Sequence, residues 1–140
     1  MKIKAIVLGI LTDWGATLIF AIPIGVIGAI FHLTHGGSIK TFEAFYHSNT
    51  PLMLASLLVG SAATVGGGVV TALVAKEHQV WNSFLMGVVT SLLGIPFCFS
   101  LPLWFTITSF LLTVPCAIFG GWIVEKHCRN HPKTPSAEKA

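Results

Sequence analysis

Charged residues are scarce in this sequence of 140 amino acids. Only 9% of the residues are Asp, Glu, Lys or Arg, whereas 54% are hydrophobic and the mean hydropathy is +0.82. Because about a quarter of the residues of a soluble domain are charged, this chain lacks the polar surface that a water-soluble domain needs. The formal net charge is +3, but the basic residues lie near the ends and in one turn. We therefore predict no nucleic-acid partner.

Motifs for catalysis or cofactor binding are also missing. The sequence has no phosphate-binding loop, no nucleophile paired with a base, and no pair of carboxylates within one apolar segment. The glutamates fall in predicted loops or in the tail: Glu43, Glu77, Glu125 and Glu138. The three cysteines do not suit a disulfide framework: Cys98, Cys116 and Cys128. The sequence therefore predicts that the protein is not an enzyme and binds no cofactor.

Four apolar segments dominate the chain, at residues 5–31, 51–75, 80–99 and 102–124. Each is long enough to cross about 30 Å of hydrocarbon as a helix, and continuous apolar segments of this length form helices in lipid. We predict an all-α integral membrane protein in which residues 1–125 form a bundle of four transmembrane helices. Residues 126–140 are polar and are predicted to form a tail.

The loop at residues 32–50 is the only long connection between these segments. Ser38 is a suitable N-cap residue, and Ile39, Phe42, Phe45 and Tyr46 recur at helical spacing after it. This pattern favours a short helix lying flat at the outer interface. The alternative is a loop that is merely rich in aromatic residues.

The positions of the cations predict how the bundle is oriented. Lys40 alone falls in the loop at residues 32–50, and the other seven cations fall on the opposite side: Lys2, Lys4, Lys76, Lys126, Arg129, Lys133 and Lys139. Cytoplasmic loops carry an excess of Lys and Arg. We therefore expect a multi-pass protein of the cell (inner or plasma) membrane with both termini in the cytoplasm.

Small residues recur at every fourth position in all four apolar segments. Such rows mark faces where membrane helices approach closely, and the glycines expected to make these approaches are Gly9, Gly60, Gly67, Gly68, Gly87 and Gly121. The sequence around Gly9 resembles that around Gly87, and Gly67-Gly68 resembles Gly120-Gly121. Two parallel helical-hairpin repeats would explain both likenesses, although apolar sequences match one another easily.

Asp13 is the only charged residue in the small-residue row of the first segment. A carboxylate within a membrane helix is a candidate functional residue. Its position in the row predicts that it faces protein, but its depth is open, because the first segment is longer than the membrane core. The partners expected for it near the cytoplasmic side are Thr71, Lys76, Asn82 and Ser83. It is either a structural aspartate held by hydrogen bonds or a carboxylate that binds a proton or a cation.

Histidines form two groups outside the apolar segments. His32, His35 and His47 lie in the external loop with Glu43, and imidazoles at such spacings can bind one metal ion. His127, Cys128 and His131 form a second group of metal-binding side chains in the tail. Because the first helix must end near Gly36, we predict no metal site and keep the external histidines as the candidates to be checked.

The sequence contains more patterns typical of helix packing than residues typical of catalysis or ligand binding. The leading hypothesis is therefore a structural or accessory subunit, whose small-residue faces pack within itself and against partner helices. The alternative is a small transporter or channel in which Asp13 is the membrane-embedded carboxylate. Four short helices rarely enclose a pathway alone, so this alternative requires an oligomer. The expected partners are membrane lipids and either further copies of the chain or other membrane-protein subunits.

Overall fold

A computed structural model describes residues 2–130, apart from the side chain of Cys98. Within these residues the chain is helical and contains four helices long and apolar enough to cross a membrane. These helices are α1 (Ile3–Thr34), α3 (Thr50–Ala75), α4 (Gln79–Gly94) with its continuation η2 (Ile95–Ser100), and α5 (Leu103–Asn130). The prediction of an all-α protein with four candidate membrane helices is confirmed.

The connection between α1 and α3 contains the short helices η1 (Ile39–Thr41) and α2 (Phe42–Ser48). The Ser38 and Thr41 side chains form a capping box at the start of η1, which supports the choice of Ser38 as a cap. The side chain of Asn49 caps α3 by accepting a hydrogen bond from the Leu52 amide at 3.2 Å. Pro51 fits the first turn of α3 because its missing amide hydrogen would have no partner within the helix.

Two helix ends differ from those expected. The third apolar segment was predicted to be helical to residue 99, but the α-helix ends at Gly94 and continues as a 3-10 helix. Pro96 cannot donate the backbone hydrogen bond of an α-helix, which explains the change. Residues 126–130 were assigned to the tail, yet α5 continues to Asn130 because no proline or glycine stops it. The remaining tail, residues 131–140, lies outside the described residues.

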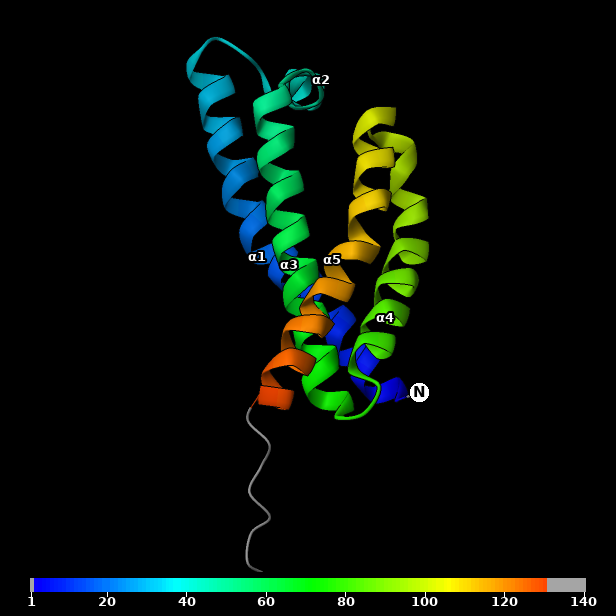
Figure 1. The fold of residues 1–140 in the computed structure, drawn as a ribbon. Helices are drawn as coiled ribbons and strands as arrows, with labels where there is room; N and C mark the ends of the chain where they lie inside the picture. The colour runs from blue at the N-terminus through cyan, green and yellow to red at the C-terminus, as the bar shows by residue number, and fades with distance from the viewer. Residues whose placement is uncertain (1, 131–140) are drawn as a thin grey trace, which may run out of the picture.

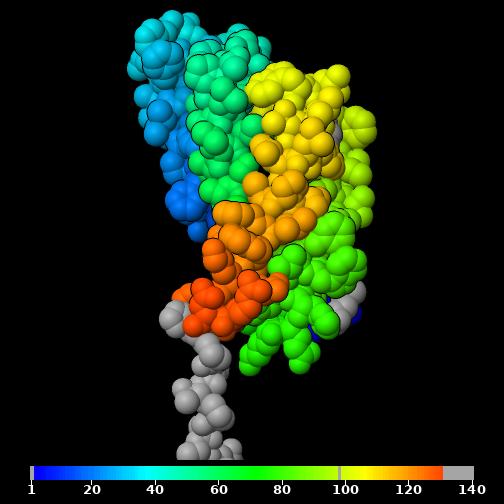
Figure 2. All heavy atoms as spheres, in the orientation of Figure 1, coloured from blue at the N-terminus to red at the C-terminus, as the bar shows by residue number. Residues whose placement is uncertain are grey.

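Toward the end that carries α2, α1 runs beside α3 and α4 runs beside α5, and these are called the two helix pairs below (Figure 1). The pairs cross near the end of the molecule where the N-terminus lies, and they diverge toward the end that carries α2 (Figure 1). α3 packs against each of the other three long helices, and α5 runs across its lower half (Figure 2). The two pairs thus share one packed end and are separated at the other.

Glycines lie where the helices cross. A Cβ atom on Gly68 would run into the backbone of Ala117, and one on Gly87 would lie 2.8 Å from the Ala117 Cβ. A Cβ on Gly67 would lie 2.8 Å from the Gly9 carbonyl oxygen. These positions have no room for a side chain, so glycine sets the separation of the helices. A Cβ on Gly121 would likewise lie 2.8 Å from the Ser83 Cβ, whereas one on Gly60 would meet no heavy atom within 4 Å.

The apolar core lies at the crossing end. Met86 and Ala117 are fully buried there and cluster with Ile6. The Ser83 hydroxyl donates to the Gly68 carbonyl oxygen at 2.9 Å and so joins α4 to α3. Large apolar side chains elsewhere on the four long helices remain exposed, as lipid-facing surfaces do. The packed core therefore closes one end of the molecule and leaves space between the pairs at the other.

Candidate functional site

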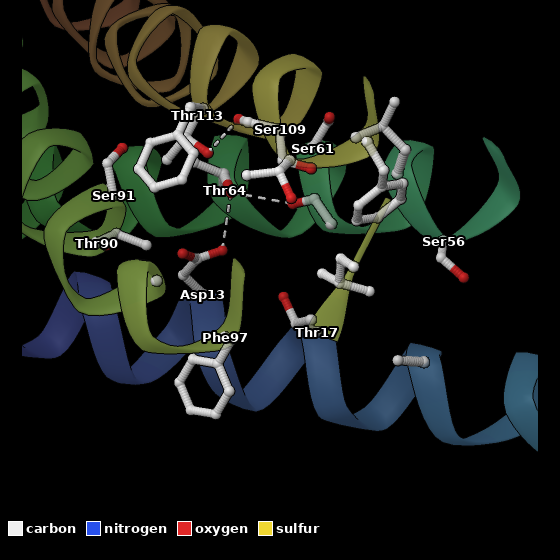
Figure 3. Close-up of a pocket in the computed structure, with 18 of the residues that line it drawn as sticks. Asp13, Thr17, Ser56, Ser61, Thr64, Thr90, Ser91, Phe97, Ser109 and Thr113 are labelled. Carbon is white, nitrogen blue, oxygen red and sulfur yellow. Dashed lines mark hydrogen bonds between the residues drawn. The ribbon is translucent and has the colours of Figure 1, made fainter. Parts of the chain in front are cut away.

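A cavity of about 610 Å³ lies between the two helix pairs. All four long helices contribute to its lining, and α2 adds Tyr46 and η2 adds Phe97. On α1 the lining runs from Asp13 to Ala21, which is toward the end of the molecule that carries α2. The cavity therefore extends from Asp13 to Tyr46 of α2, and Figure 3 shows part of its lining around Asp13.

Asp13 lies at the inner end of this cavity. Its side chain is only 3% exposed, and Oδ1 accepts a hydrogen bond from Thr64 Oγ1 at 3.0 Å (Figure 3). Thr64 lies about halfway along α3, so the carboxyl group sits near the middle of that helix. Asp13 therefore contacts the central part of α3 and not its end.

Close approach of α1 and α3 explains why Asp13 meets Thr64. A Cβ on Gly67 would lie 2.9 Å from the Asp13 Cβ, and one on Gly9 would run into the Thr71 hydroxyl. Because Gly67 is three residues after Thr64, the two share one face of α3. The bare Gly67 backbone lets Asp13 pack against α3, and its carboxyl group then reaches the hydroxyl one turn away.

The partners predicted for Asp13 from the sequence were wrong. Thr71 donates to Gly67 O at 2.9 Å, and Ser83 donates to Gly68 O. Asn82 donates to Glu77 O and His78 O, so its amide closes the turn between α3 and α4. These groups are held by backbone carbonyls nearer the crossing end. Thr64 lies between Gly60 and Gly68 at every-fourth-residue spacing on α3, but this spacing does not specify which residue of α3 meets Asp13.

Hydroxyl groups line much of the cavity, a feature that the sequence analysis missed. The contributing residues are Thr17, Ser56, Ser61, Thr64, Thr90, Ser91, Thr106, Ser109 and Thr113. Some bond to carbonyls of their own helix, as Ser91 does to Gly87 O and Thr113 to Ser109 O. Within the described part of the chain, Thr90 Oγ1 and Thr106 Oγ1 are buried without a hydrogen-bond partner. A buried hydroxyl left unpaired costs free energy, so these two threonines weaken the packing around the cavity.

Aromatic side chains complete the lining: Trp14, Tyr46, Phe97, Phe105 and Phe110. Tyr46 also fixes α2 to α3 through a hydrogen bond of 2.6 Å between its hydroxyl and Ser56 Oγ. Ser56 Oγ donates its own proton to Leu52 O at 3.1 Å, so Tyr46 is the donor to Ser56. The short helix α2 is therefore attached at the outer end of the cavity through a residue that lines it.

The three histidines near the connection between α1 and α3 pack locally. His32 Nε2 hydrogen-bonds Thr41 Oγ1 at 2.9 Å, and its ring stacks on Phe45 at 4.5 Å. His35 Nδ1 bonds Phe31 O at 2.8 Å, and His47 meets Tyr46 edge-on. The described residues contain no group of three or more His, Cys, Asp or Glu side chains placed to hold a metal ion. His131, the third member of the tail group, lies outside them.

The site joins one carboxyl group to an apolar, hydroxyl-bearing cavity. Asp13 is the only residue with a side-chain carboxylate, amine, guanidinium or imidazole among the described residues that line it. A buried carboxyl group can hold a proton or a cation, and it favours a cation over an anion. No protein-family model matches the chain, and no curated protein or solved structure shows significant similarity to it.

Proposed function

We propose that this protein is a small membrane transporter in which Asp13 binds a proton or a cation. The observation that carries the proposal is the position of Asp13: its buried carboxyl group ends a cavity of about 610 Å³ that reaches α2. Ionisable residues inside membrane bundles usually face the interior and mark ion or solute pathways. The lysine distribution predicts that the α2 end faces outward, so the proposed state is open to the outside.

The Thr64 hydroxyl suits either charge state of Asp13. An ionised carboxylate would accept the Thr64 proton, as the 3.0 Å distance to Oδ1 allows. A protonated Asp13 would instead donate to Thr64 Oγ1, whose proton would then go to Gly60 O at 3.0 Å. Both arrangements satisfy the hydroxyl without moving a heavy atom. Asp13 could therefore gain and lose a proton or a bound cation while the helices stay packed.

The two helix pairs supply the moving parts of this proposal. Many transporters expose a central site to each side in turn by rocking one repeat against the other. Here the pairs meet at the crossing end and enclose the cavity at the other. Rocking about the crossing would close the cavity at the α2 end and expose Asp13 to the opposite side. The weak sequence repeat between the two hairpins agrees with such a division.

Reconstitution tests the proposal directly. Purified full-length protein is placed in vesicles that contain a pH-sensitive dye, and small cationic and neutral solutes are added outside one at a time. We expect at least one solute to drive proton movement, and we expect Asp13→Asn to abolish that movement. The control is Glu43→Gln, since Glu43 is an exposed carboxylate on α2 outside the cavity lining. Absence of solute-dependent flux in the wild type, or equal flux in Asp13→Asn, would overturn transport.

An accessory, helix-packing role remains the second candidate. It is supported by α1, of which only 6% of the most apolar stretch is buried and where Gly15 and Gly25 have open space around them. Most of the glycines that first suggested this role meet helices of the same chain instead. Isolation in mild detergent distinguishes the two roles. A stable large complex with other subunits supports the accessory role, and a small homo-oligomer supports transport.

A further inference from the structure

We propose that the cavity between the helix pairs binds an organic cation with an aromatic or apolar body. In this site Asp13 receives the ammonium group and the aromatic residues surround the rest of the molecule. The inference rests on the proposed function in taking this cavity as the solute site, and it adds the chemical class of the solute. It follows from the charge, the lining and the size of the cavity.

The charge of the cavity lining favours a positively charged solute. The described lining contains one carboxylate and no lysine, arginine or histidine. Placing an anion beside Asp13 would bring two negative charges together in a poorly hydrated space, where their repulsion is much stronger than in water. A cation instead gains an ion pair with Asp13, whose Oδ1 is only 3.0 Å from the Thr64 hydroxyl and so remains oriented.

The aromatic residues select an organic body over a bare metal ion. Trp14, Phe97 and Phe105 all line the cavity. The faces of aromatic rings attract organic cations, and they offer apolar surface to the carbon skeleton as well. Calcium and magnesium ions instead require about six or more oxygen ligands around a compact site. The lining supplies a single carboxylate at one end, and its hydroxyl groups are spread over all four long helices, so it does not form such a compact shell.

The size of the cavity suits a molecule with one or two rings. Its volume of about 610 Å³ lies within the range of about 300–1,000 Å³ for sites that take drug-sized ligands.

Three probes of similar shape test this inference: dibenzylammonium, the neutral dibenzyl ether and the anion diphenylacetate. Binding to the full-length protein in detergent is measured by equilibrium dialysis, with protein-free micelles as the background. We expect saturable binding of dibenzylammonium, binding of the ether weaker by about tenfold or more because it lacks the charge, and no saturable binding of the anion. Equal or tighter binding of the ether or the anion would overturn the inference without any variant.

Two variants locate the binding site. Asp13→Asn should weaken dibenzylammonium binding by about tenfold or more and leave ether binding unchanged, whereas Glu43→Gln should change neither. Circular dichroism melting establishes that each variant is folded. Because the comparison of the three probes uses only the wild-type protein, it decides the inference even if Asp13→Asn fails to fold. Undiminished ammonium binding to folded Asp13→Asn would place the cation elsewhere and overturn the inference.

Binding and flux separate this inference from the proposed function. Saturable ammonium binding without solute-driven flux in vesicles would support the cation site and overturn transport. Flux of another solute, without charge-selective binding of dibenzylammonium, would support transport and overturn the cation site.

Discussion

Asp13 is held by a hydroxyl group. Thr64 donates to it at 3.0 Å, and the carboxyl group is almost fully buried. An ionised carboxylate in an apolar environment is costly unless it is paired or well hydrogen-bonded. One hydroxyl compensates that cost only in part, so Asp13 stabilises the fold less than an apolar residue of its size could.

The first prediction tests whether the contact between Asp13 and Thr64 serves binding or only stabilises the fold. Thr64→Val keeps the shape of the side chain but removes the hydroxyl, so Asp13 loses its donor. Leaving a buried polar group unpaired costs about 1–3 kcal/mol, and we expect the free energy of unfolding to fall by that amount. We also expect cation binding and flux to fall. The measurements are chemical unfolding in detergent and the dialysis and vesicle assays.

Thr71 provides the matched control for Thr64. Both threonines are buried on α3, and the hydroxyl oxygen of each lies within hydrogen-bond distance of the carbonyl four residues earlier, at 3.0 Å for Thr64 and 2.9 Å for Thr71. Of the two, it is Thr64 that hydrogen-bonds Asp13, whereas Thr71 donates to Gly67 O. Thr71→Val should therefore affect stability alone, and Thr64→Ser should retain binding. If Thr64→Val and Thr71→Val lower binding equally, the contact with Asp13 has no special role.

At the scale of the helices, the second prediction concerns the crossing of α3 and α5. A single methyl group at Gly68 would run into the backbone of Ala117, and backbone cannot move aside as a flexible side chain can. We expect Gly68→Ala to lower the free energy of unfolding by about 1–3 kcal/mol, as overpacking of a close contact does. Thermal and chemical unfolding in detergent measure this loss.

The control lies two residues away on the same helix. A Cβ on Gly66 would meet nothing within 4 Å. Alanine is favoured over glycine within helices by up to about 1 kcal/mol in water, so Gly66→Ala should be neutral or stabilising. Equal losses for both substitutions would mean that the α3–α5 crossing is looser than described.

The third prediction concerns the attachment of α2. Tyr46→Phe removes the hydroxyl that donates to Ser56 at 2.6 Å, while the ring remains. We expect faster hydrogen exchange in peptides that cover residues 42–48, because α2 has only seven residues and depends on contacts with its neighbours. Ser56→Ala should have the same effect, and the double variant should add little to either single one. Additive effects would show that the two residues act independently.

At the scale of the whole molecule, the sequence predicted those features that depend on the length of the apolar segments and on the spacing of small residues. Long apolar segments predict four helices because lipid offers no other partner for the backbone, and Gly68 and Gly87 were identified because close helix crossings in membranes require small residues. The contact between Asp13 and Thr64 could not be predicted, since it depends on how far α1 slides along α3. The cavity was missed for a related reason: it lies where the helix pairs diverge, and their crossing angle is not encoded in any single segment.

The orientation of the protein in the membrane is a separate prediction, because it depends on the positions of the cations and not on how the helices pack. The transport proposal requires the α2 end, where the cavity lies, to face outward. Lys2, Lys4 and Lys76 are at the opposite end of the described helices, at the start of α1 and the end of α3, and such residues are retained in the cytoplasm.

The last prediction tests this orientation with single cysteines in a chain whose own cysteines are replaced by serine. Ser48 and Glu77 are both exposed; Ser48 ends α2, and Glu77 lies in the turn between α3 and α4. A membrane-impermeant maleimide should label Ser48→Cys in intact cells and Glu77→Cys only after lysis. Neither change removes a cation, so neither should invert the protein. Labelling of Glu77→Cys alone in intact cells would mean that the cavity opens to the cytoplasm, and any solute would then enter the described state from inside.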